Sequence, residues 1–415
     1  MGSEPGSKEV SVIIPTRNRK ELLEFTLLSL YDQSVPSSAF EVVVVDDGST
    51  DGTAELLAVI RPPYRLKVLR NNSNRGAAYS RNQGIKASSG EILIFLDEML
   101  VDSNYIRDHL RCHSKEGLVV TTTFNGQFIY THFYPGFNPV QQLDCKQVAY
   151  RTGVWSRIVD RYGQGEVIRL FRREQVQNHD VLRYGRRDEH IRRFFTAMQE
   201  AYGESLERMA APWIMMVTNG LSVSREMLDE AGLFDEGFKG AWLEDWELGY
   251  RLHKAGATFI NAKDIDCFHQ AHPVSTAFRL ENYLYFARKH PDTEVLLIAA
   301  TGSPFYWTLE QWGKIVTQYR DLVGTGGELR REWTEAFRDL AENLYWFSSE
   351  VMAGRFPPSP KTVEERFSRW NPSFASMVQE QSRQLHQESL SSGRYWELLG
   401  AFEVLLHLPV KGRRA

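Results

Sequence analysis

Two adjacent carboxylic acids, Glu244 and Asp245, are the residues of this chain best suited to chemistry. Their segment, GAWLEDWELGYRL, surrounds them with apolar side chains at Trp242, Leu243, Trp246, Leu248 and Leu252. Burial of this kind disfavours the charged form of a carboxyl and raises its pKa toward that of a useful general base. Acids are also common at ordinary helix starts, where they favour the helix dipole. The segment therefore predicts either a catalytic base or a structural helix turn.

The N-terminal third of the chain alternates apolar runs with helix-spaced segments. It predicts strands at Val10–Ile14, Phe40–Val45, Leu66–Leu69 and Glu91–Leu96, and helices at Lys20–Tyr31, Thr53–Val59 and Gly76–Ala87. Strands without polar alternation, separated by helices, indicate a parallel sheet covered on both faces. Ligands bind outside the carboxyl ends of such strands. Pro15, Thr16, Asp47 and Asp97 lie at these ends and are candidate binding residues.

The middle of the chain has a different composition. The Thr- and aromatic-rich segment Val119–Tyr134 is typical of strands at a sheet edge, and a further strand is expected near Thr258–Ile260. Between them, residues 151–193 are dense in arginine: Arg169, Arg172, Arg173, Arg183, Arg186, Arg187, Arg192 and Arg193. No apolar period is sustained there, which predicts partly mobile helices and loops. The segment is either a solvated surface insert or a cationic lid or acceptor site.

From Ala277 onward the pattern is helical. An apolar stripe recurs at helical spacing in Trp333, Phe337, Leu340, Leu344 and Phe347, and it predicts internal packing, with a homodimer interface through these C-terminal helices as the alternative. We therefore expect four regions: a disordered N-terminus (1–9), a first half of an α/β domain (10–118), a second half carrying the insert (119–276) and a helical region (277–415).

Bulk composition excludes several classes of protein. A formal net charge of -4 gives no overall attraction to nucleic acid. No apolar run approaches the roughly 20 residues that span a bilayer, and residues 1–9 do not resemble a secretory signal. Three scattered cysteines suit a reducing compartment. We expect a cytoplasmic protein, with peripheral association at the cytoplasmic membrane face through Lys411, Arg413 and Arg414 as a weaker alternative.

Four segments, in order, resemble motifs of the family 2 (GT-A fold) glycosyltransferases. They are VSVIIPTRNR at Val10–Arg19, VVVVDDGSTDGT at Val42–Thr53, NRGAAYSRNQGIKASSGEILIFLD at Asn74–Asp97, and NGLSVSREMLDEAGLFDEGFKGAWLEDWELGYRL at Asn219–Leu252. The resemblance implies a Rossmann-like, mostly parallel sheet flanked by helices, here with a C-terminal helical appendage. It also implies inverting transfer of a sugar from a nucleotide-diphospho sugar, most often UDP-linked, to a glycan, a lipid-linked acceptor or another acceptor.

The resemblance also implies roles for the acid pair and its neighbours. Asp245 would deprotonate the acceptor, and Glu244 would orient the acceptor or support Asp245. Trp242 and Trp246 would form an apolar platform for a sugar ring, although buried tryptophan is commonly core. Asn219, at the start of the same motif, would lie on the acceptor side.

On the donor side, the resemblance implies that Asp47 accepts a hydrogen bond from the imide of the nucleobase. Pro15, Thr16 and Arg17 would lie near the base and the ribose. Arg81 would engage the base or a phosphate through its guanidinium, or would only tie its helix to the strand end that follows.

A divalent cation, Mn²⁺ or Mg²⁺, is expected because charge builds on the leaving diphosphate, and such cations prefer carboxylate oxygens. The family provides an Asp-x-Asp motif, but this chain reads Asp97-Glu98-Met99, so the second aspartate is replaced by Met99 unless one residue is deleted. Asp97 and Glu98 remain candidate ligands. His269 is a third, although a histidine packed in a loop explains it equally well.

Two other functions are consistent with parts of the pattern. The altered metal motif would suit a non-catalytic protein that binds nucleotide sugars. A sugar nucleotidyltransferase would need a glycine-rich loop after the first strand, and residues 14–18 contain no glycine. The acceptor is not encoded in the motifs, although the arginine-rich segment suggests an anionic one.

Overall fold

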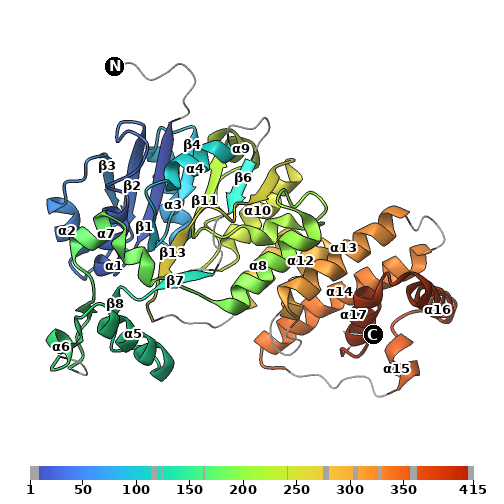
Figure 1. Ribbon diagram of the computed structural model, residues 1–415. Coiled ribbons are helices and arrows are strands. Elements are labelled where there is room, and N and C mark those ends of the chain that lie inside the picture. Colours follow the sequence, from blue (N-terminus) through green and yellow to red (C-terminus); the bar gives the residue numbers. More distant parts are fainter. Residues whose placement is uncertain are drawn as a thin grey trace. The chain divides into compact units, whose positions relative to one another are not determined.

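The computed structural model describes residues 9–113, 119–122, 126–161, 164–240, 242–273, 280–301, 307–325, 330–355 and 362–409. The chain forms two compact units, one within residues 1–207 and 212–276 and the other within residues 208–211 and 277–415 (Figure 1). Residues 1–8 of the expected disordered N-terminus lie outside the described residues. So do Lys411, Arg413 and Arg414, the candidate membrane-binding residues.

A seven-stranded sheet is the centre of the first unit, with the order β12-β6-β11-β4-β1-β2-β3. Its strands are β1 (Val10–Thr16), β2 (Phe40–Asp46), β3 (Arg65–Arg70), β4 (Ile92–Phe95), β6 (Val119–Thr122), β11 (Leu221–Ser224) and β12 (Thr258–Asn261). β11 runs antiparallel to β4 and β6, and the other pairings are parallel. The predicted mostly parallel α/β sheet is confirmed.

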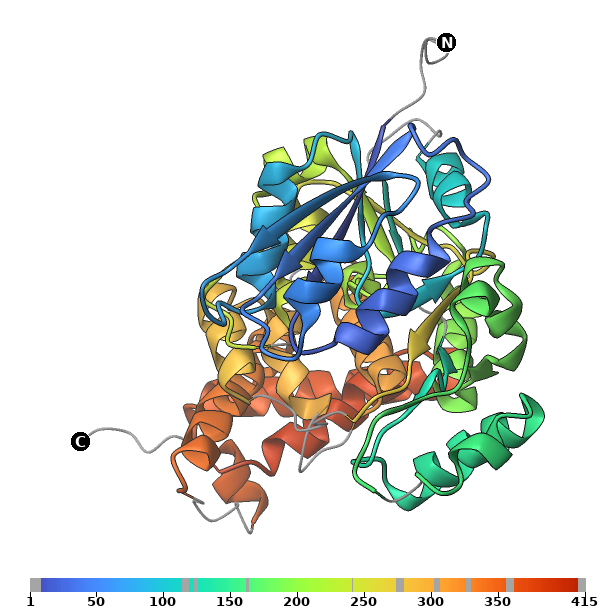
Figure 2. The ribbon, with the colours of Figure 1, turned by 90° about the vertical axis from the view of Figure 1, so that its left-hand side faces the viewer.

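Helices cover both faces of this sheet, as Figure 2 shows. They include α1 (Lys20–Ser29), α2 (Thr53–Val59), α3 (Ala77–Ala87), α4 (Tyr105–Cys112), α9 (Arg225–Ala231) and α10 (Glu244–Lys254). α3 lies unusually close to the sheet because Gly84 has no side chain: a Cβ there would come within 2.5 Å of Ile13 Cγ2. This close approach brings Arg81, on the same helix, against the strand ends.

A second sheet of four short strands has the order β10-β7-β13-β5, and β8 (His132–Phe133) pairs with β9 (Ile168–Arg169). The four strands are β5 (Met99–Val101), β7 (Gln127–Ile129), β10 (Arg186–Arg187) and β13 (Cys267–Gln270). The expectation that Val119–Tyr134 forms edge strands of the main sheet was therefore only partly correct. β6 lies next to the edge strand β12, whereas β7 and β8 belong to other sheets.

The arginine-rich segment forms short elements around a core. They are α6 (Trp155–Ile158), α7 (Arg173–Gln177), the 3₁₀ helix η1 (Asp180–Tyr184) and the start of α8 (Glu189–Tyr202), preceded by α5 (Pro139–Arg151). Ile168, Leu170, Val176 and Val181 are buried in one cluster with Phe25 of α1. The expectation of partly mobile helices and loops without an apolar pattern overlooked this core, because elements of two to five residues are too short to display a period.

The second unit is helical, as predicted. It contains α11 (Leu280–Lys289), α12 (Thr293–Leu296), η3 (Leu297–Thr301), α13 (Leu309–Thr325), α14 (Arg331–Met352), α15 (Val363–Phe367), α16 (Pro372–Ser392) and α17 (Trp396–Leu406). Trp333 stacks on Phe337 and Phe402 at centroid distances of 5.5 and 4.7 Å. Trp333, Phe337, Leu340 and Leu344 are fully buried, which confirms internal packing for this part of the stripe. Phe347 is partly exposed, and the homodimer interface stays a prediction. None of the described helices is both long and apolar enough to cross a bilayer.

Candidate active site

The acid pair lies at the first turn of α10, after a strained turn. Trp242 and Leu243 have φ angles of 90° and 73°, in the left-handed region that non-glycine residues rarely adopt. Such a conformation costs about 1–3 kcal/mol per residue and persists only where surrounding contacts enforce it. The helix begins immediately after this turn, with the N–H of Glu247 donating to the carbonyl of Leu243 at 3.0 Å. The turn therefore fixes the direction in which both acids leave the backbone.

Glu244 and Asp245 have different surroundings: the first is buried and the second is partly exposed. Glu244 is 3% exposed, and its Oε1 accepts a hydrogen bond from Arg81 Nη1 at 3.0 Å. Asp245 is partly exposed, and its Oδ1 accepts from the N–H of Trp246 at 2.9 Å. Burial, and then the charge of Glu244, raise the pKa of Asp245 to about 7, although Arg81 acts in the opposite direction. Asp245 therefore has the accessibility and the proton affinity of a general base near neutral pH.

Arg81 connects three parts of the site. Its Nη2 donates to both carboxylate oxygens of Asp97 at 3.2 Å and to Thr218 Oγ1 at 2.8 Å. The Arg81 side chain is 4% exposed; burial lowers its pKa, but the charges of Asp97 and Glu244 outweigh this effect and raise the pKa overall. Arg81 thus ties α3 to the end of β4 and to the start of α10, the second of its two expected roles. Its contact with a donor stays a prediction.

The altered metal motif occupies the short connection between β4 and β5. Met99 is fully buried in the core and pairs with His269 across β5 and β13. Glu98, directly before the strand, is 17% exposed, and its Oε1 lies 3.9 Å from Arg19 Nε. Met99 is therefore an interior strand residue, and Asp97 and Glu98 remain the candidate carboxylates of this connection.

His269 lies on strand β13, not in a loop. Its ring centroid is 5.0 Å from that of His272, whose Nδ1 lies 2.9 Å from the carbonyl of Pro273. Burial, with help from Arg19, lowers the pKa of His269 to about 3 and that of His272 to about 4. Both rings are neutral at physiological pH, which is the form that binds metals.

The described residues contain no cluster of three or more His, Cys, Asp or Glu side chains that could hold a metal ion. A carboxylate and a neutral imidazole, Glu98 and His269, fit a cation whose remaining ligands come from a substrate. Asp97 accepts two hydrogen bonds from Arg81, so about two acceptor positions of its carboxylate remain for a cation. The metal site stays a prediction.

On the donor side, Asp47 is 5% exposed and organises the turn before α3. Its carboxylate accepts from Asn71 Nδ2 at 2.8 Å and from the backbone N–H groups of Arg75 and Gly76 at 2.8 and 2.9 Å. A carboxylate has about four acceptor positions, so one remains for a ligand. Asn71 was missed by the sequence reasoning. It follows the carboxyl end of β3, so the strand-end rule could have found it.

The first strand contributes residues of differing exposure. Thr16 is 4% exposed, and its Oγ1 has no hydrogen-bond partner among the described residues. Pro15 is partly exposed, and Arg17 is exposed. Neighbouring Asn18, with a φ of 52°, donates its N–H to Ser49 Oγ at 2.9 Å and ties this loop to the one after β2.

The expected acceptor residues differ in exposure. Trp242 is 52% exposed beside the acid pair, whereas Trp246 is partly buried, with its ring centroid 6.3 Å from that of the buried Trp213. Asn219 is partly exposed, and its carbonyl accepts from the thiol of Cys267 at 3.5 Å. Trp242 thus has the exposure that a sugar platform needs.

Comparisons with known proteins found similar solved structures and similar sequences. Staphylococcus aureus TarS residues 1–349, solved in complex with UDP, matches with a TM-score of 0.47 and 17% identity, over 86% of this chain and 94% of that one. The uncharacterized glycosyltransferase YfnE of Bacillus subtilis is 34% identical over 267 residues, 64% of this chain and 65% of that protein. Validoxylamine A glucosyltransferase of Streptomyces hygroscopicus subsp. limoneus is 31% identical over 290 residues, 68% of this chain and 57% of that protein.

The chain thus spans less than two thirds of the length of these two relatives. Residues 11–124 match the family model of Glycosyl transferase family 2. That region contains Asp47, Arg81 and Asp97, whereas the acid pair lies beyond it. From these sequence matches, the chain belongs to glycosyltransferase family 2.

Proposed function

We propose that this chain transfers a sugar from a nucleotide-diphospho sugar to an acceptor hydroxyl, with inversion at the anomeric carbon and with Asp245 as the general base. The observation that carries the proposal is the partly exposed Asp245 carboxyl, whose pKa is raised to about 7 by burial and by Glu244. A base with a pKa near the working pH is effective in proton transfer.

The proposed sugar transfer is a single displacement, in which one bond to the anomeric carbon forms as another breaks. The acceptor O–H gives its proton to an oxygen of Asp245, and the acceptor oxygen attacks the anomeric carbon from the face opposite the leaving group. The bond from that carbon to the diphosphate oxygen breaks, and its electron pair leaves with the nucleoside diphosphate. One carboxylate suffices for this step. Glu244 and Arg81 position Asp245 through their buried 3.0 Å ion pair.

The donor would bind at the carboxyl ends of β1 and β2. The Thr16 hydroxyl, which has no partner within the described parts of the chain, and the remaining acceptor position of Asp47 support a nucleoside site there. The family resemblance favours a uridine nucleotide. Arg17, which is exposed nearby, would meet the ribose or the diphosphate.

A divalent cation, Mn²⁺ or Mg²⁺, would be held by Glu98 and His269. When bound, such an ion neutralises charge on the leaving diphosphate. Asp97 would support the site indirectly, by holding the Arg81 guanidinium in place through its two hydrogen bonds. The cation can be tested without turnover: UDP should raise the melting temperature more with Mn²⁺ than with EDTA, and the variant Glu98→Gln should lose that difference. Equal stabilisation by UDP under both conditions would remove the cation from the proposal.

The function is tested by incubating the purified chain with a panel of nucleotide sugars and following hydrolysis and transfer by proton NMR, which also reports the anomeric configuration. Asp245→Asn should lower turnover by about 10²–10⁴-fold. Asp229→Asn, the same change at an exposed position of α9, is the matched control and should retain turnover. Full activity of Asp245→Asn would exclude the assigned base. Donor binding without turnover in the native chain would favour the non-catalytic alternative.

A further inference from the structure

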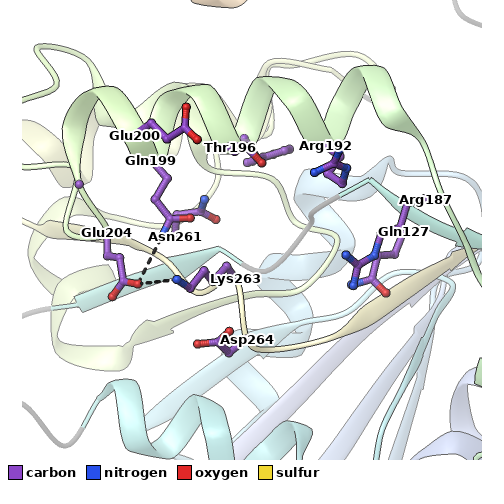
Figure 3. A pocket seen from close by; sticks show the side chains of 12 residues that line it. Gln127, Arg187, Arg192, Thr196, Gln199, Glu200, Glu204, Asn261, Lys263 and Asp264 are labelled. Carbon is purple, nitrogen blue, oxygen red and sulfur yellow. Dashed lines mark hydrogen bonds and ion pairs between the residues drawn. The ribbon is translucent and has the colours of Figure 1, made fainter.

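The first unit contains a cavity of about 660 Å³ that none of the residues of the candidate active site lines. Its walls come from α8, from the end of β12 and the residues after it, and from β7 and β10 (Figure 3). Gln127, Gln199 and Asn261 contribute amides, and the remaining lining is mostly charged.

Topology places this cavity on the same edge of the sheet as the reacting groups. β12 is parallel to β6, and β11 is antiparallel to both β6 and β4, so β12 and β4 point in the same direction. Asn261 ends β12, and Asp97 follows β4. Three steps between neighbouring strands separate them in the order β12-β6-β11-β4, a span of roughly 14 Å. A short oligosaccharide can bridge that span.

Asn261 indicates that the cavity is a binding site. The residue is 2% exposed, its backbone N–H donates to the carbonyl of Glu204 at 3.0 Å, and its side-chain Oδ1 has no hydrogen-bond partner among the described residues. Buried polar atoms are rarely left without a partner. Asn261 lines the cavity, so a ligand hydroxyl that reaches Oδ1 would supply the missing hydrogen bond. Gln127, also 2% exposed, is held in place by donating its amide to Asp266.

The charges of the cavity select the kind of ligand. Equal numbers of basic and acidic side chains line it: Arg187, Arg192, Lys263, Glu200, Glu204 and Asp264. Lys263 Nζ lies 3.1 Å from Glu204 Oε1, and Arg192 pairs with Glu189 at 2.7 Å. A polyanion would meet the acids as well as the bases, whereas a neutral ligand with many hydroxyls can use the amides and both kinds of charge.

We propose that this cavity binds a neutral saccharide unit of the acceptor, away from the hydroxyl that reacts. The inference rests on the proposed function, because the saccharide is placed relative to Asp245 and the donor. It predicts that acceptors of several sugar units bind better than the corresponding monosaccharides, and that the preference depends on Asn261 and on the open space beside α8.

The test uses the full-length chain and an array of neutral and acidic oligosaccharides with the matching monosaccharides. Thr196, an exposed residue of α8 that lines the cavity, is changed to Trp to fill it. The matched control is Ala201→Trp, an exposed position of the same helix outside the lining. Asn261→Ala removes the side-chain Oδ1 that has no partner among the described residues. Melting temperatures verify that each variant is folded.

Neutral oligosaccharides should bind the native chain and the Ala201→Trp variant, and Thr196→Trp should lose this binding. Asn261→Ala should weaken it by about threefold to tenfold, the effect of one neutral hydrogen bond. The inference is overturned if no neutral oligosaccharide binds, if acidic ones bind better, or if Thr196→Trp binds like its control. Donor hydrolysis by the native chain separates the two proposals: hydrolysis without these glycan effects overturns the saccharide site alone, whereas absence of donor hydrolysis counts against the proposed function.

Discussion

An ion pair of the buried Arg81 and an ion pair of the exposed Arg183 can be compared, and the comparison shows what burial adds. Arg81 is 4% exposed and pairs with Glu244, which is 163 residues away in the sequence. Arg183, in the arginine-rich segment, is 66% exposed and pairs with Asp180 three residues earlier. The first pair joins separate elements and excludes water, whereas the second only bridges one turn of a short helix. A guanidinium therefore organises the site only where the fold brings distant acids to it.

The comparison also bears on the acceptor. Most arginines of the segment already have acid partners: Arg169 and Arg173 with Glu24, Arg183 with Asp180, Arg186 with Asp144, and Arg192 with Glu189. Cations neutralised in this way attract an anionic acceptor weakly. The anionic acceptor suggested by composition alone thus loses much of its basis, and a neutral saccharide agrees better with the cavity.

Removing the buried guanidinium should have the largest effect on stability. In Arg81→Gln, the carboxyls of Glu244 and Asp97 lose their buried cation, which should lower the free energy of unfolding by about 3–5 kcal/mol. Urea unfolding near neutral pH measures this change. The double variant Arg81→Gln with Glu244→Gln should recover part of the loss, because it removes one of the two carboxyls. A loss below about 1 kcal/mol in the single variant would contradict a structural role for Arg81.

The pKa of Asp245 gives the next prediction. Turnover should rise with pH and level off above about 7, because Asp245 must be deprotonated to act as a base. Glu244→Gln should shift the midpoint to lower pH, since the charge of Glu244 raises that pKa. A midpoint that does not move would show that burial alone sets it. Arg81 is the cation facing the pair, and its own charge does not change over this range.

The same carboxyl links activity to stability. The pKa of Asp245 is about 7 in the folded chain and about 4 in the unfolded chain. The protonated carboxyl therefore contributes fully to the free energy of unfolding below about pH 4, and this contribution is lost as the pH rises through 7. Asp245→Asn should therefore be more stable than the native chain by about 4 kcal/mol near pH 8, and equally stable near pH 3. Thermal unfolding at the two pH values measures the difference. A variant that is less stable at both would indicate a structural acid.

The sequence predicted the buried strands well, because β1, β2 and β4 each contain an uninterrupted apolar run, at residues 12–14, 42–45 and 92–95. The strand-end rule then identified Asp47 and Asp97. It could not pair Met99 with His269, because β5 and β13 have three and four residues and meet only through long-range contacts. Nor does the sequence state that Arg81 contacts Glu244. Such contacts depend on how α3 and α10 pack, and this information is absent from local patterns.

The turn before the acid pair should show a smaller effect. Trp242 has a φ of 90°, which glycine adopts without strain and alanine does not. Trp242→Gly should therefore unfold with a free energy about 1 kcal/mol larger than that of Trp242→Ala. Comparing these two variants removes the effect of the missing indole, which both share. Both should weaken acceptor binding if the exposed ring is a sugar platform. Equal stability of the two variants would show that the turn relaxes at no cost.

The smallest effect is expected at the exposed arginine with which the comparison began. Arg183→Gln removes a pair between side chains that are 66% and 41% exposed, so water already solvates both charges. The free energy of unfolding should change by at most about 0.5 kcal/mol, and high salt should abolish even that difference. Measured beside Arg81→Gln, the same substitution at the two sites isolates the effect of burial and of contact between distant elements. A loss at Arg183 as large as that at Arg81 would mean that the arginine-rich segment depends on its ion pairs more than on its apolar core.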